Sequence, residues 1–247
     1  MSELKSYAVW DATTRWFHWI NVLCIIALTA VGLVILNEGS LGITNAGKAS
    51  LKTVHVWIGY AFTLNLLWRL VWAFLGNRYA RWRAFLPGGE GYFQAVRSYI
   101  AAFIAGHPEQ YLGHNPLARL STTALFLLIA ILAVTGLVLA GTDLFYPPIG
   151  HWIGQWVAAP GVDPGALKPY SPEMYDAAAF QAMRAFRKPF AVVHLYAFYV
   201  LLILVVLHVA AVVIEEVKEG GNIISAMFTG RKIIRGQPVD QEHDGQD

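Results

Sequence analysis

Residues 189–214 read PFAVVHLYAFYVLLILVVLHVAAVVI, an apolar run that contains two histidines, His194 and His208. A run of this length can cross the hydrocarbon of a bilayer as an α-helix. Ionisable or ligating side chains are rare in such a segment because they are costly in lipid, and they usually have a function there. Fourteen residues make nearly four helical turns, about 21 Å of rise, so both rings return to nearly the same face. We therefore predict a membrane helix that offers one ligand near each side of the bilayer.

Three further runs have the length of a membrane span. The four predicted spans are residues 17–36, 53–75, 119–140 and 190–214. Of the 247 residues, 56% are hydrophobic and 14% charged, and the mean hydropathy is +0.48. The sequence predicts an all-α membrane protein, a four-transmembrane-helix bundle with short amphipathic helices in the connections. We expect one domain over residues 1–230 and a disordered cytoplasmic tail over residues 231–247.

Composition excludes several classes of protein. A net charge of +2 gives no strong attraction to nucleic acid. The single cysteine, Cys24, allows no disulfide framework, and the chain has neither a CxxCH motif for covalent haem nor a CxxC pair. The N-terminal stretch is polar for too long to be a signal peptide, so the first apolar run is predicted to be a retained span.

Lysine and arginine predict the orientation of the spans. The N-terminal tail, the connection 76–118 and the C-terminal tail, together with Arg69 and Arg119, contain 12 of the 18 basic residues. The connections 37–52 and 141–189 contain the other six, three of them crowded at the start of the fourth span. The positive-inside rule therefore places both termini in the cytoplasm.

This orientation sorts four histidines into two levels. His55 and His194 lie near the outer face, and His18 and His208 lie near the inner face. Each level then has one histidine from the fourth span and one from another helix, which is suited to two bis-histidine haems b stacked across the membrane. Small residues leave room for a flat macrocycle at Ala27, Gly32, Gly59 and Gly136.

Other interpretations of these residues stay open. A histidine-based proton relay or metal transporter is one alternative, although it would normally recruit carboxylates and the four spans contain none. Arg15, Arg69 and Arg187 could pair with haem propionates, or could snorkel and set the topology. The remaining histidines lie in connections or in the tail and are expected to be structural or solvent-exposed rather than haem ligands.

Four motifs carry a family resemblance. They are VWDATTRWFHW (9–19), VHVWIGYAFTLNLLWRLVWAFLGNRYAR (54–81), GHNPLARL (113–120) and NIISAMFTGRK (222–232), with a TG pair at 135–136. With these motifs the chain resembles the b-type cytochrome subunit of membrane-bound nickel–iron hydrogenases, in the wider group that includes the formate dehydrogenase cytochrome anchor. The resemblance implies a diheme cytochrome that takes electrons from a periplasmic small subunit and passes them to quinone. It assigns His55 and His194 to the outer haem, and His18 and His208 to the inner haem.

The resemblance also has departures and further implications. LYAF follows His194 where the hydrogenase subunits tend to have an arginine and a glycine, and the connection 141–189 differs from theirs. The partner could therefore be a c-type cytochrome or another periplasmic dehydrogenase, and a stand-alone transmembrane oxidoreductase is a further alternative. A homodimer within a larger complex is also compatible with the chain.

By analogy with the formate dehydrogenase anchor, a quinone site is expected at His114 and Asn115. Asn can hydrogen-bond a quinone carbonyl, and His can deliver a proton. Asn115 followed by Pro116 is equally a good start for a helix.

Overall fold

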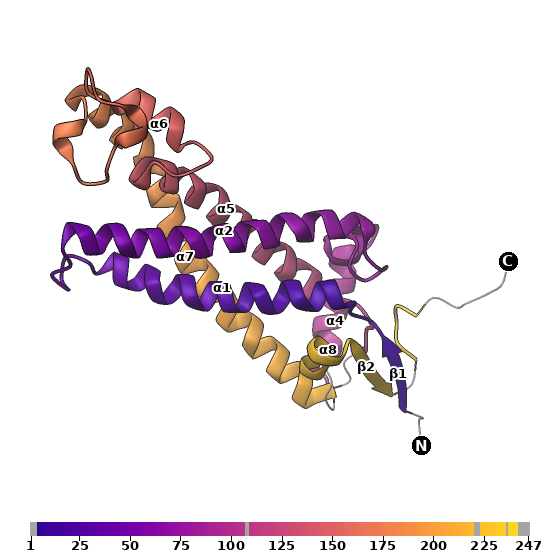
Figure 1. The fold of residues 1–247 in the computed structure, drawn as a ribbon. Helices are drawn as coiled ribbons and strands as arrows, with labels where there is room; N and C mark the ends of the chain where they lie inside the picture. The colour runs from indigo at the N-terminus through magenta and orange to yellow at the C-terminus, as the bar shows by residue number, and fades with distance from the viewer. Residues whose placement is uncertain (1–3, 107–108, 220–222, 236, 242–247) are drawn as a thin grey trace. The chain divides into compact units, whose positions relative to one another are not determined.

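The computed structural model describes residues 4–106, 109–219, 223–235 and 237–241 (Figure 1). Within them the chain is mainly helical. In chain order the elements are β1 (Leu4–Ala8), α1 (Ala12–Leu36), α2 (Asn45–Leu75), α3 (Trp82–Phe85), α4 (Tyr92–Ile104), α5 (Pro116–Leu144), α6 (Gly150–Val157), the 3₁₀ helices η1 (Pro164–Ala166) and η2 (Pro172–Met174), α7 (Ala177–Glu219), α8 (Ile223–Thr229) and β2 (Arg231–Arg235).

Four of the described helices, α1, α2, α5 and α7, are long and apolar enough to cross a membrane, which confirms the predicted spans. Large apolar side chains on their surfaces remain exposed, and Leu23, Leu64 and Val206 are each about two-thirds accessible. A helix surface of this kind is suited to lipid contact rather than to water.

Carboxylate and amide side chains start three of these helices. Asp11 accepts a hydrogen bond from the Thr14 amide at 2.7 Å, and Asp176 accepts one from the Ala179 amide at 2.8 Å. Asn115 accepts one from the Ala118 amide at 2.7 Å. Each cap satisfies a backbone donor that has no partner inside the helix.

The predicted fourth span, 190–214, forms only part of α7, which begins at Ala177 and has Pro189 inside it. Proline removes one backbone hydrogen bond. A break in the helix within a membrane would leave more backbone groups without hydrogen-bond partners. The helical hydrogen bonds therefore continue on both sides of Pro189.

The tail differs from the expected disorder over residues 231–247. Arg231–Arg235 form β2, which pairs antiparallel with β1, Ala8 opposite Arg231 and Leu4 opposite Arg235. The reason is a long-range backbone pairing that local composition does not reveal. Residues 236 and 242–247 lie outside the described part of the chain.

The chain divides into two compact units. The first comprises Met1–Trp19, Leu67–Leu127 and Leu201–Asp247, and the second comprises Ile20–Leu66 and Leu128–Val200. A small core in the first unit contains Val9, Leu112 and Ile234, and one in the second contains Ile153, Val157 and Met183.

Candidate functional site

The second unit brings His55 of α2 against His194 of α7. Their ring centroids are 6.4 Å apart, and the ring planes are inclined by 70°. Iron–nitrogen bonds to imidazole are about 2 Å long, as for other first-row metals. Two imidazoles on opposite sides of one iron would therefore have centroids about 6 Å apart. The observed spacing fits a bis-histidine haem.

Glycines lie beside these rings. A Cβ atom placed on Gly32 would lie 3.4 Å from Cε1 of His55, and one placed on Gly136 would lie 3.4 Å from Cε1 of His194. Nothing lies within 4 Å of a Cβ placed on Gly59, one turn after His55. Gly32 and Gly136 bring helix backbone close to the two imidazoles, and there is open space at Gly59 of α2.

The first unit contains His18 of α1 and His208 of α7, which lie close enough that a positive charge on His208 would disfavour one on His18. The Trp19 ring meets the His18 ring edge-on, with centroids 5.1 Å apart. Nδ1 of His18 is buried and has no hydrogen-bond partner among the described residues. The two units thus contain the same histidine pairs that topology predicts, and their role as ligands stays a prediction.

The three arginines predicted to meet propionates have different surroundings. Arg69 is only 4% exposed, lies over the rings of Phe17, Phe85 and Phe126 at 5.0–5.7 Å, and donates to the Ala80 carbonyl at 2.9 Å. Its other terminal nitrogen is buried and has no partner in the described part of the chain.

Arg15 resembles Arg69 in this respect. It donates to the Phe228 carbonyl through Nη1, whereas its buried Nε has no partner among residues that the structure describes. Two buried donors without acceptors in the unit that contains His18 and His208 fit an anionic group such as a propionate.

Arg187 is held differently, because Asp143 binds it. Nη2 of Arg187 donates to Asp143 at 2.8 Å and Nε makes a second, short contact. Lys52 also contacts this carboxylate, at 3.0 Å. The Arg187 guanidinium is therefore engaged within the protein, which favours a structural role over propionate binding.

Asn115 has a full set of structural contacts. Besides capping α5, its side-chain nitrogen donates to Tyr99 Oη and to Glu215 Oε1, both at 2.9 Å. It is 6% exposed. The geometry favours the helix-start interpretation of this residue over the quinone interpretation.

One ring nitrogen of His114 is available to bind another group. Its Nδ1 is buried without a hydrogen-bond partner in the described residues, and its ring meets Trp10 edge-on at 5.0 Å. Burial lowers the pKa of His114 to about 3, with further lowering by Lys232, Arg69, Arg119 and His208. The ring is therefore neutral at physiological pH and able to donate or accept one hydrogen bond.

The pKa of His114 predicts a pH dependence of stability. A histidine titrates near 6.5 when unfolded, so between about pH 3 and pH 6.5 the unfolded chain binds one more proton than the folded chain. Unfolding free energy should therefore fall as the pH drops through this window, by up to about 1.4 kcal/mol per pH unit. His114→Gln should remove this contribution and His151→Gln should not, as measured by denaturation at pH 5 and pH 7.5. Equal pH slopes in His114→Gln and wild type would contradict the prediction.

Asp240 and Lys232, near the C-terminus, form hydrogen bonds with the loop that precedes His114. The sequence did not predict these contacts. Asp240 accepts hydrogen bonds from the amides of Leu112 and Gly113 at 2.6 and 2.8 Å. Lys232 of β2 donates to the carbonyl of Gly113 at 3.2 Å. No local pattern marks Asp240, because its partners lie more than 120 residues away.

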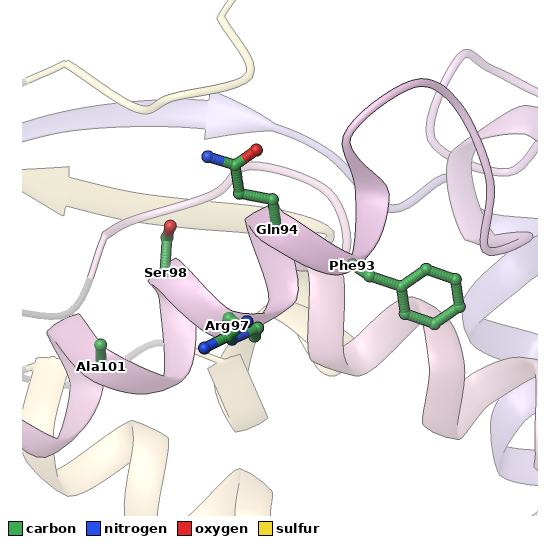
Figure 2. Close-up of a pocket in the computed structure, with 5 residues that line it drawn as sticks. All are labelled: Phe93, Gln94, Arg97, Ser98 and Ala101. Atoms are coloured by element: carbon green, nitrogen blue, oxygen red, sulfur yellow. The ribbon is translucent and has the colours of Figure 1, made fainter.

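A separate surface hollow of about 590 Å³ lies along α4 in the first unit. Its lining residues are Phe93, Gln94, Arg97, Ser98 and Ala101 (Figure 2). Gln94 and Ser98 point to the same side of the helix in Figure 2. The lining contains no histidine, so the hollow is distinct from the paired imidazoles.

Apolar spanning helices that offer paired imidazoles define a class of protein, the helical membrane cytochromes with haem bound between helices. Residues 9–230 match the family described as prokaryotic cytochrome b561. The chain belongs to this family, so it is a multi-pass b-type cytochrome that carries haem b and transfers electrons.

Relatives of known description are similar over most of the chain. A "Probable Ni/Fe-hydrogenase B-type cytochrome subunit" of Cupriavidus necator is 26% identical, covering 94% of this chain and 89% of that protein. The protein of the same description from Bradyrhizobium diazoefficiens is 28% identical, covering 92% and 86%. A "Probable Ni/Fe-hydrogenase 1 B-type cytochrome subunit" of Escherichia coli is 32% identical, covering 56% and 61%.

Proposed function

We propose that this protein is a diheme b-type cytochrome that relays electrons between a periplasmic hydrogenase and the quinone pool of the inner membrane. The observation that carries the proposal is the facing of His55 and His194 at 6.4 Å, a spacing suited to one iron between them. Hydrogenase association rests on the descriptions of the related proteins.

Two pairs of imidazoles would hold the haems, His55 with His194 and His18 with His208. Bis-imidazole haem supplies a one-electron couple with no open coordination position, which suits electron transfer rather than oxygen chemistry. The protein contributes the ligands, the burial and the neighbouring arginines Arg15 and Arg69. The four histidines lie on α1, α2 and α7, and α5 places Gly136 beside His194.

The distribution of basic residues supports cytoplasmic termini, with the His55–His194 pair toward the periplasm. The connection 141–189 then faces the partner. It presents exposed aromatic side chains, including Trp152 and Trp156 of α6 and Phe186 of α7. Aromatic residues of this kind are enriched at protein interfaces.

A quinone would meet the protein beside the His18–His208 pair. His114 is the residue that we assign to it, because its buried Nδ1 has no hydrogen-bond partner among the described residues and a positive charge on His208 would disfavour its protonation. A neutral imidazole can hydrogen-bond a quinone carbonyl oxygen. Arg119 and Lys232 bring positive charge to the same place, which would stabilise the negative charge that a quinone oxygen gains on reduction before it is protonated.

The proposal is tested with the purified protein in lipid vesicles. We expect two haems b per chain, a low-spin bis-imidazole spectrum, and oxidation of both haems when a quinone analogue is added to the reduced protein. His114→Gln should slow that oxidation while both haems remain. A protein with one haem or none, or with a high-spin spectrum, would contradict the proposal. Co-purification of a hydrogenase, a c-type cytochrome or no partner decides among the alternatives for the donor.

A further inference from the structure

Thr135 of α5 lies against the imidazole of His194 in the second unit. Its Oγ1 is 2.8 Å from Nδ1 of His194, and the residue is only 6% exposed. The Thr135 hydroxyl carries a single proton, so it can donate to only one neighbour and must accept from the others that it bonds.

The direction follows from the other contacts of Thr135. Its Oγ1 lies 2.7 Å from the carbonyl oxygen of Ile131 and 3.3 Å from that of Leu132, and both of these atoms only accept. The Thr135 hydroxyl therefore donates within its own helix, and its oxygen accepts from His194. The proton of the neutral His194 ring is then on Nδ1, which leaves the lone pair of Nε2 free to bind iron.

His55 lies beside Gly32 as His194 lies beside Gly136, but its ring has no such hydrogen bond with a hydroxyl-bearing side chain among the described residues. The Cβ sites of Gly32 and Gly136 have the same distances to their histidines, 3.4 Å to Cε1 and 3.9 Å to Nδ1. Val31 precedes Gly32, whereas Thr135 precedes Gly136. Nδ1 of His55 has no hydrogen-bond partner within the described residues. Of these two rings, His194 is the one oriented by a side-chain hydrogen bond.

We propose that Thr135 is the positioning residue of His194 and that it lowers the potential of the haem held by His55 and His194. The proposal rests on the proposed haem ligation. A donor bond from Nδ1 makes the imidazole more electron-rich and fixes its orientation, and an electron-rich ligand stabilises ferric iron. Loss of the bond should shift the equilibrium toward ferrous iron.

The test compares Thr135→Val, which removes the hydroxyl at nearly constant shape, with Thr135→Ser, which keeps it. Thr142→Val is the matched control, because Thr142 is also buried in α5 and also donates within its helix, to the carbonyl of Val138 at 3.1 Å. Redox titration should show one haem of Thr135→Val shifted about tenfold toward the ferrous form, about 59 mV for one electron. The low-spin electron paramagnetic resonance signal of that haem should change as well. Thr135→Ser and Thr142→Val should behave as wild type.

Several results would overturn the proposal. Unchanged potentials and an unchanged resonance signal in Thr135→Val would do so, and so would an equal shift in Thr142→Val. If Thr135→Val loses the haem, Thr135→Ser decides, because retention there supports the hydroxyl and equal loss refutes it. A wild-type protein without haem at His194 would contradict the proposed ligation instead, so the two failures are distinguishable.

Discussion

His194→Ala is expected to remove one haem and leave the other, and His208→Ala is expected to do the same for the second haem. In the proposed ligation, each substitution would delete one of the two imidazoles that hold one haem, and the remaining histidine, His55 or His18, could not hold a six-coordinate haem alone. Because each pair lies in a different unit, the two losses should be independent. The haem content should fall from two per chain to one in each variant.

Haem extraction, optical spectra and redox titration of the two variants check this expectation. The haem that stays in His194→Ala should have the potential that is missing from His208→Ala, so the two spectra should add up to that of wild type. His151→Ala is the matched control, because His151 is an exposed histidine of α6 and bonds only Gln155 among the described residues. Full haem content in both ligand variants would refute the ligand assignment.

Asp143→Asn should destabilise the protein by about 3 kcal/mol. Its carboxylate binds Arg187 and Lys52 together, and the Asp143 side chain is only 13% exposed. Asparagine is nearly the same size but carries no charge, so two partly buried cations would lose their counterion. Removing one member of a buried ion pair costs more than the pair contributes, because the remaining charge is left without compensation.

Thermal or denaturant unfolding in detergent, followed by haem absorbance, measures this loss. Glu38→Gln is the matched control, since Glu38 pairs with Lys48 at 3.4 Å in a more accessible place and should cost less than about 1 kcal/mol. A similar small cost for Asp143→Asn would mean that Arg187 has another anionic partner when haem is bound, as the propionate hypothesis predicts.

Local sequence was sufficient for the spanning helices, because apolar composition over about 20 residues is a property of each segment alone. It was less reliable at helix ends. The region before Pro189 joins the fourth span in α7, since an unbroken backbone ladder outweighs one missing donor. The predicted disorder over residues 231–247 is wrong for residues 231–235, because β2 pairs with a strand at the opposite end of the chain.

The candidate site, too, was only partly predictable from local sequence. Histidines inside apolar runs are visible in any sequence, and the order of the spans predicts that His55 and His194 lie near each other, as the structure has them. The partners of Arg187 and Asn115 were not visible, because Asp143 and Glu215 are 44 and 100 residues away from them. In the sequence Thr135 stands out only as part of a family motif, and its bond to His194 depends on how α5 packs against α7.

Hydropathy was therefore enough to predict four spanning helices, and the helical repeat predicts that His194 and His208 share one face of α7, while their role as ligands stays a prediction. Both are set by composition and by the helical repeat, which act within one segment. The orientation of the His194 ring, the counterion of Arg187 and the attachment of the tail came from the folded chain. Each is a hydrogen bond or an ion pair between residues far apart in sequence, and such contacts exist only once the helices have packed.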